Sequence, residues 1–297
     1  MPKPTLPKAT ITPRRSEDRK YTKGQGNWLR SYQTFSFDSN YDHKYTNFGS
    51  IMVLNEDLVA PRKGFATHHH QDAEIFSYVL KGQLTHRDST VKKGDEEMGE
   101  EEKRGKRLFC RMKRGDVQFT TGGSGISHSE QNEKSKVVHF LQIWIRPWKD
   151  GLKPIYHTRT FNDSDKKEGF VLIISPLAAG PEATLADEEA AIPKVPETIP
   201  IHADFVMGAS IIGAGSMFSW IVGGGSDIVS SKKKRNVYVH VAMTAGGKAK
   251  VRLDGREEAG ELNEGDGAFV SGVNAGDMLT VESIGSVEAE VVVLDSN

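Results

Sequence analysis

The sequence predicts an all-β protein with two domains or one large domain, and three observations lead to this class. Its 297 residues exceed the ~100–200 residues of a usual single domain. Glycine accounts for 30 residues, about 10% of the chain against a usual ~7%, and indicates many tight turns. Between these turns lie short segments rich in Val, Ile and Thr, which is the composition of β-strands.

Charge and composition exclude several classes of protein. The 39 basic and 40 acidic residues leave a net charge of −1, so no global field attracts nucleic acid, and we expect no direct binding to it. The most apolar run, residues 170–179, is too short for a membrane helix and is broken by Pro176, which predicts a soluble protein without membrane contact. Cys110 is the single cysteine, so an intrachain disulfide is excluded and a reducing compartment is favoured.

Along the chain, residues 1–21 come first, and we expect a disordered basic arm there because prolines interrupt any helix. From about Tyr32 the chain alternates strand-like segments with turns. In residues 137–145, VVHFLQIWI, apolar side chains occupy both alternating faces, which predicts a strand covered on both sides. Residues 92–107 hold six acidic and six basic side chains, so we expect a solvated insertion, with a lid as the alternative.

The second half of the chain repeats this organisation. Residues 166–204 contain prolines and acidic residues around one short helical stretch, and we expect a linker or insertion. Turn signals then recur about every ten residues over 205–297, which predicts a second β-domain. The boundaries expected from the sequence are therefore 22–165 for the first domain and 205–297 for the second.

Two short motifs carry the chemistry. In THHHQDAE, His68 and His70 share one face of an extended segment while His69 points to the other. In GISHSEQN, His128 and Glu130 have the same spacing and also share a face. Each pair alone is a weak signal. Together they offer three imidazoles and a carboxylate, which suit Fe(II), Ni, Mn, Co, Cu or Zn and leave open positions on an octahedral ion.

The segments GFATHHHQDAEIFSYVLKGQLTHRDS and GDVQFTTGGSGISHSE resemble the two halves of the metal-binding barrel of the pirin family, within the cupin superfamily. The resemblance extends over about residues 32–161. It implies a bicupin, two tandem jelly-roll barrels facing each other, with the metal site in the first. It also implies that the metal is iron and that its ligands are His68, His70, His128 and Glu130.

The resemblance leaves other titratable residues with supporting roles. Glu74 stands where many cupins place a ligand, but we expect it beside the ligands rather than on the metal. His86 is expected to form hydrogen bonds inside the sheet. Over residues 166–297 the metal motif is absent, and only His202 and His240 occur there, so we expect one metal ion per chain.

Two functions from different classes follow from the resemblance. The first is a quercetinase-type dioxygenase, an oxidoreductase that opens the heterocyclic ring of flavonols with O2, with Glu130 as the catalytic base. The alternative is a non-enzymatic, iron-dependent transcription co-regulator that senses redox state and acts through a protein partner. The two readings differ in the need for a flavonol-sized cavity beside the metal. A cytoplasmic or nuclear location and a monomeric state are compatible with both.

Overall fold

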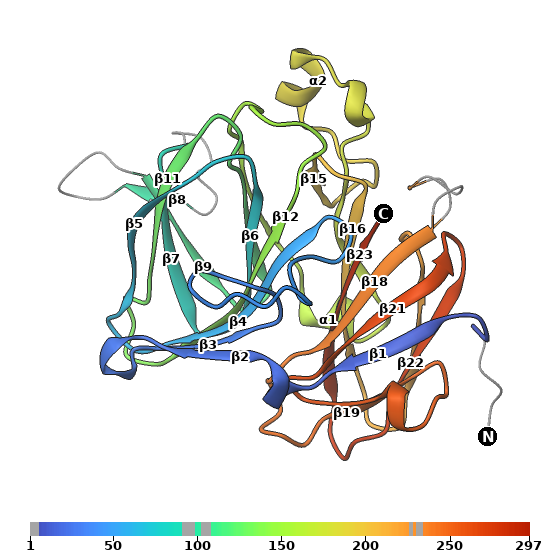
Figure 1. Cartoon of the computed structure of the whole chain (residues 1–297). Helices are drawn as coiled ribbons and strands as arrows, with labels where there is room; N and C mark the ends of the chain where they lie inside the picture. Colours follow the sequence, from blue (N-terminus) through green and yellow to red (C-terminus); the bar gives the residue numbers. More distant parts are fainter. Residues whose placement is uncertain (1–5, 91–98, 102–107, 226–227, 230–233) are drawn as a thin grey trace. The chain divides into compact units, whose positions relative to one another are not determined.

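The computed structural model describes every residue of the chain except 1–5, 91–98, 102–107, 226–227 and 230–233. Its regular structure consists mainly of strands, with only short helices, so the all-β prediction is confirmed (Figure 1). The chain divides into two compact units, as a two-barrel protein requires. Unit 1 comprises Met1–Arg19, Asn47–Ile51 and Phe161–Asn297, and unit 2 comprises Lys20–Thr46 and Met52–Thr160.

Unit 2 is built from two antiparallel sheets, which Figure 1 shows as separate layers with β5 and β7 in one and β6 and β12 in the other. The seven-stranded sheet has the order β13 (Tyr156–Thr160), β10 (Asp116–Thr121), β6 (Glu74–Lys81), β12 (Val138–Ile145), β4 (Ile51–Val59), β3 (Leu29–Gln33) and β2 (Lys20–Lys23). The five-stranded sheet has the order β5 (Gly64–His70), β11 (Ile126–Gln131), β7 (Gln83–Asp88), β9 (Leu108–Lys113) and β8 (Gly99–Glu101).

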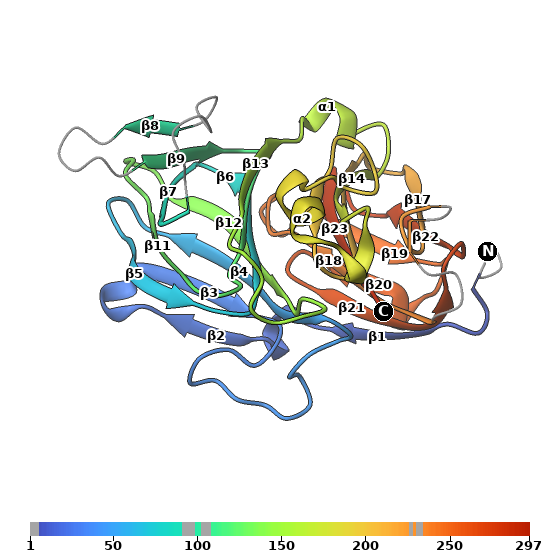
Figure 2. The ribbon, with the colours of Figure 1, turned by 90° about the horizontal axis from the view of Figure 1, so that it is seen from above.

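Unit 1 also contains two sheets, coloured mainly orange to red in Figure 2. The seven-stranded sheet has the order β1 (Thr10–Arg14), β21 (Gly267–Asn274), β18 (Lys234–Val241), β23 (Ala289–Ser296), β16 (Phe205–Ile212), β14 (Val171–Pro176) and β15 (Ile199–Ile201). The four-stranded sheet has the order β17 (Met217–Ile221), β22 (Met278–Ser283), β19 (Lys250–Leu253) and β20 (Glu261–Asn263). The short helices are α1 (Asp163–Lys166) and α2 (Leu185–Ala190), with 3₁₀ turns at Ser16–Asp18, Gln25–Asn27, Gly180–Glu182 and Glu258–Gly260.

The strand over residues 137–145 is confirmed as β12, and seven of its eight residues are buried. It pairs with β6, whose residues from Glu74 to Leu80 are all buried as well. Side chains of both faces of these central strands are therefore shielded from water, which removes the polar alternation that a half-exposed strand would show. Cys110, on β9, is 2% exposed and belongs to the core, as expected for an inert thiol.

The amino-terminal segment differs from the disordered arm expected over residues 1–21. Strand β1 pairs antiparallel with β21 along its whole length, and Figures 1 and 2 show it beside that strand. Ile11 is buried in the core of unit 1, and Pro13 fits because β1 is an edge strand, where a missing N–H breaks no ladder. Composition alone does not reveal this order, because the pairing partner lies more than 250 residues away in sequence.

This segment provides a test of the fold. Ile11→Ala is expected to destabilise the protein by about 2–4 kcal/mol, because it removes buried methyl groups from the core of unit 1. Thr10→Ala, the matched control at an exposed position of the same strand, is expected to change the free energy of unfolding by less than about 0.5 kcal/mol. Both are measured by denaturant unfolding. If both substitutions change the free energy of unfolding negligibly, the segment is a disordered arm after all.

Residues 166–204, expected as a linker or insertion, contribute to the sheet of unit 1. Strand β14 pairs antiparallel with β16, and β15 pairs parallel with β14. Between them α2 begins with a capping box, in which the Thr184 side chain accepts from the backbone of Asp187 and the Asp187 side chain accepts in return. The prolines therefore separate short ordered elements, and unit 1 resumes at Phe161 rather than at residue 205.

The charged insertion at 92–107 lies outside the described residues except for β8, which pairs antiparallel with β9 at the edge of the five-stranded sheet. Among the residues that the structure describes, every helix is too short or too polar to span a lipid bilayer.

Candidate metal centre and its cavity

Strand β5 presents two histidines to the interior of unit 2. His68 and His70 are partly buried and flank His69, which is exposed, as the alternation of an extended segment predicts. Nδ1 of His68 lies 2.7 Å from the carbonyl oxygen of Ala66. Because a carbonyl can only accept, Nδ1 carries the proton and donates it, which leaves the lone pair of a neutral His68 on Nε2.

Strand β11 brings the second motif onto the first. It pairs antiparallel with β5, with His128 directly opposite His68, and an extra residue in β5 shifts the register before Glu130. His128 and Glu130 are both about 1% exposed and share the inward face of β11. Nε2 of His128 lies 3.0 Å from Nε2 of His68. The two motifs, about sixty residues apart in sequence, are thus neighbours in the fold.

The three imidazoles form a compact donor set. Ligand nitrogens of His68, His70 and His128 all lie within 4.8 Å of one another. Nε2 of His70 is buried and has no hydrogen-bond partner among the described residues. A buried, unpartnered nitrogen beside two others is costly unless a further group binds it, and three neutral imidazoles suit a borderline divalent ion. The residues present therefore fit a transition metal.

Burial keeps the imidazoles of His70 and His128 neutral. Desolvation, reinforced by the neighbouring histidines, lowers the pKa of His70 to about 4 and lowers the pKa of His128 far below its ordinary value. Since only the neutral imidazole offers a lone pair, His70 and His128 are in their metal-binding form at pH 7.

His86 contacts Nδ1 of His128, the ring nitrogen that does not face His68. Its Nε2 lies 2.9 Å from Nδ1 of His128, and its Nδ1 lies 3.5 Å from the hydroxyl of Tyr156. Burial lowers the pKa of His86 to about 3, so this hydrogen bond joins two neutral rings. With Nδ1 of His128 engaged in this bond, Nε2 is the atom directed at the other two histidines. His86 is thus a hydrogen-bonding residue within the sheet, as expected.

Asp88 also contacts this group, and the sequence reasoning missed it. It lies opposite His128 in the ladder, with Oδ2 3.9 Å from Nδ1 of His128, and it accepts a hydrogen bond from Thr120 at 3.1 Å. Burial raises its pKa. The sequence signal for this contact was the spacing of two residues between His86 and Asp88 in THRD, because such residues share one face of a strand.

Glu130 accepts hydrogen bonds from two residues of the seven-stranded sheet. Ser77 donates to Oε1 at 2.8 Å, and Gln142 donates to Oε2 at 2.9 Å. Its carboxylate is not part of the three-histidine cluster, although it lines the same cavity. Each oxygen keeps a second lone pair, so metal ligation requires loss of neither hydrogen bond. Despite these bonds, burial raises the pKa of Glu130 to about 7.

Glu74 lies at the start of β6 and is fully buried. Its Oε2 accepts a hydrogen bond from the hydroxyl of Thr121 at 3.2 Å. Within the described part of the chain, its carboxylate does not belong to the three-histidine cluster, and it does not line the cavity. That Glu74 lies beside the ligands rather than on the metal stays a prediction.

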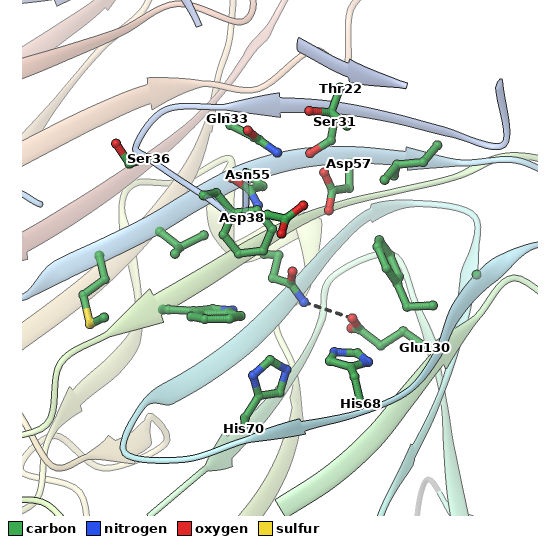
Figure 3. A pocket seen from close by; sticks show the side chains of 18 of the residues that line it. Thr22, Ser31, Gln33, Ser36, Asp38, Asn55, Asp57, His68, His70 and Glu130 are labelled. Carbon is green, nitrogen blue, oxygen red and sulfur yellow. Dashed lines mark hydrogen bonds between the residues drawn. The ribbon is translucent and has the colours of Figure 1, made fainter. Parts of the chain in front are cut away.

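A cavity of about 920 Å³ adjoins the histidines inside unit 2. Aromatic side chains form two pairs on its wall. The Trp144 ring lies 4.8 Å from the His70 ring and 5.4 Å from that of Phe37, and the rings of Trp28 and Phe65 lie 5.2 Å apart. Figure 3 shows His68, His70 and Glu130 on one side of this cavity.

A polar wall faces the histidines across the cavity, and sequence reasoning missed it (Figure 3). Its side chains come from neighbouring strands of the seven-stranded sheet and are those of Thr22, Ser31, Gln33, Asn55 and Asp57. Burial raises the pKa of Asp57 to about 7, and the nearby charges of Glu130 and Glu56 add to the shift. The only available signal was that three consecutive polar residues, Asn55 to Asp57, interrupt the otherwise apolar segment IMVLNEDLV.

Comparisons with known proteins agree with this architecture. The family model described as Pirin matches residues 15–145. A pirin-like protein of Caulobacter vibrioides is 30% identical over 237 residues, which cover 80% of this chain and 85% of the relative. A quercetin 2,3-dioxygenase of Escherichia coli is 38% identical over 150 residues, covering 50% of this chain and 57% of that enzyme. The chain spans 57% to 65% of the length of the first curated relatives that it matches.

Among solved structures, the bacterial pirin YhhW of Escherichia coli in complex with nickel(II) matches with a TM-score of 0.69 and 24% identity, covering 97% of this chain and 99% of that chain. At this level of identity the likeness concerns the fold alone.

Proposed function

Because the chain belongs to the pirin family, we propose that it is a metal-dependent dioxygenase of the quercetin 2,3-dioxygenase type, which opens the heterocyclic ring of a flavonol with O2. One observation carries the proposal: an aromatic-lined cavity of about 920 Å³ lies directly beside the three-histidine cluster and Glu130. This volume lies within the ~300–1,000 Å³ range of typical small-molecule sites. A redox sensor that acts only through its surface would not need such a cavity.

In this proposal His68, His70, His128 and Glu130 hold one Fe(II) ion, with nickel, manganese, cobalt, copper or zinc as alternatives. The bound ion would supply Lewis acidity and the capacity to react with O2. The protein itself orients the ligand lone pairs. Nδ1 of His68 is bonded to Ala66 and Nδ1 of His128 to His86, so Nε2 of both rings is directed toward the site.

Glu130 is the proposed general base. A pKa of about 7 places its proton affinity near the ambient pH, where a carboxylate can both take and return a proton. Ser77 and Gln142 fix the carboxylate at the edge of the cavity, so that it can accept the proton of a flavonol hydroxyl. The aromatic pairs provide flat, apolar contact for the rings of the substrate and exclude water from the reaction.

The test is to load the protein with Fe(II) in the absence of oxygen, add quercetin, and then admit air while the flavonol absorbance is recorded. We expect loss of the absorbance in the loaded protein and none in the chelator-treated protein. Parallel samples receive nickel, manganese, cobalt or copper. If no metal supports turnover, the dioxygenase proposal fails and an iron-dependent interaction protein takes its place.

A further inference from the structure

Strand β4 carries the polar side chains that face the metal-binding histidines. Asn55 and Asp57, at alternate positions, line the cavity together with Val53. Glu56, between them, instead lies 2.9 Å from Nε2 of His139. Asn55 is 1% exposed and Asp57 is 2% exposed, so both polar side chains have been almost completely removed from bulk water.

The neighbouring polar side chains of the wall have hydrogen-bond partners, whereas Asn55 and Asp57 each have one acceptor atom without a partner among the described residues. Asn40 donates to both Thr22 and Gln33 at 2.9 Å. Ser31, opposite Asp57 in the ladder, donates to the Asp57 carboxylate. Oδ1 of Asn55 and Oδ1 of Asp57, however, accept no hydrogen bond from the described residues. A buried acceptor without a donor destabilises the folded protein, and a ligand that brings a donor regains that free energy.

The position of the two acceptors specifies the ligand that fits. Residues two apart on a strand are about 6.6 Å apart, so donors on separate ring positions can reach both. Figure 3 shows these residues across the cavity from His68 and His70. Both Oδ1 atoms are buried acceptors without a donor, so a ligand that brings hydroxyl donors to these two positions is favoured.

We propose that Asn55 and Asp57 form a hydroxyl-recognition subsite, which binds phenolic hydroxyls of a flat aromatic substrate at the end remote from the oxygens directed toward His68, His70 and Glu130. This inference rests on the proposed function, because it assigns the orientation of the substrate in the same cavity. The subsite selects polyhydroxylated substrates over those that carry only the hydroxyl and carbonyl pair of the reacting ring.

The experiment measures binding without turnover. Metal-loaded protein under anaerobic conditions is titrated with quercetin and with 3-hydroxyflavone, which has the reacting hydroxyl and carbonyl pair but lacks the other hydroxyls. Quenching of tryptophan fluorescence reports binding, since Trp28 and Trp144 line the cavity. The parent protein is expected to bind quercetin at least about 10-fold more tightly, as two additional hydrogen bonds to buried acceptors predict.

Asp57→Leu and Asn55→Leu, which replace each side chain by an apolar one of similar size, are expected to weaken quercetin binding about 10-fold and to leave 3-hydroxyflavone binding unchanged. Asp57→Asn keeps an acceptor and safeguards against a folding defect, and its preference is expected to be intermediate. Asp38→Asn is the matched control, because Asp38 lines the same cavity but is exposed. This variant is expected to retain the full preference.

The outcomes separate the two proposals. If both flavonols bind the parent protein equally, or if the preference persists in Asp57→Leu and Asn55→Leu, the subsite is overturned while the dioxygenase proposal stands. If neither flavonol binds or is turned over by the parent protein, the proposed function itself is overturned, and the subsite with it.

Discussion

His128→Ala is expected to reduce the affinity for a divalent transition metal by more than the ~10- to 100-fold that loss of a residue supporting a ligand typically costs. The parent chain is expected to bind close to one equivalent of metal. His128 is nearly fully buried, and its Nε2 lies 3.0 Å from that of His68, so its removal takes away one of three clustered nitrogens. It also leaves His86 without its partner on β11. Metal content after dialysis against a weak chelator measures the effect.

His69→Ala is the matched control for this prediction. His69 lies on the same strand as His68 and His70 but is exposed on the other face. The His69→Ala variant is therefore expected to retain full metal content. Thermal unfolding without metal checks that His128→Ala still folds, and His70→Ala, at a partly buried position, provides a second variant. Equal metal loss in His69→Ala, or undiminished binding in both His128→Ala and His70→Ala, would rule out the three-histidine site.

Glu130→Gln is expected to lower flavonol turnover by about 10²- to 10⁴-fold, the range of lost general-base catalysis, while part of the metal is retained. The variant should fold, because the Ser77 hydroxyl can either donate or accept and the Gln142 amide can rotate to match the new amide. The new side chain cannot take a proton, so the effect should appear in kcat. Rates are compared per bound metal ion, which separates catalysis from metal loss.

Glu133→Gln serves as the comparison for Glu130→Gln. Glu133 lies three residues further along, pairs with Arg87 at 2.7 Å and does not line the cavity, so turnover should match that of the parent protein. Turnover at the parent rate in metal-replete Glu130→Gln would exclude Glu130 as the base and favour catalysis by the metal alone.

Much of the candidate site could be predicted because it depends on local geometry. In an extended strand, side chains two residues apart share a face, so the pairs His68 with His70 and His128 with Glu130 follow from their spacing. The resemblance to pirins then joined two weak motifs into one site. The two-sided burial of β12 was likewise readable, since apolar side chains occupy both alternating positions.

The remaining features depend on contacts between distant segments. The Glu130 pKa of about 7 is set by burial between two sheets, which its own neighbours in sequence do not reveal. The polar wall depends on which face of β4 meets the cavity, because Asn55 and Glu56 are equally polar in sequence and only Asn55 lines it. The contact between His86 and His128 requires the register of β7 against β11.

By itself, then, the sequence determined the strand alternation, the all-β class and the residue types suited to a metal, since these properties are carried by short-range periodicity and side-chain chemistry. Only the tertiary structure decided that β1 forms an edge strand of the sheet of unit 1, that residues 166–204 contribute β14 and β15 to that sheet, and that Asn55 and Asp57 face the histidines. The physical reason is that strand pairing and burial are satisfied by partners far away in the chain, and the free energy of those contacts outweighs local composition.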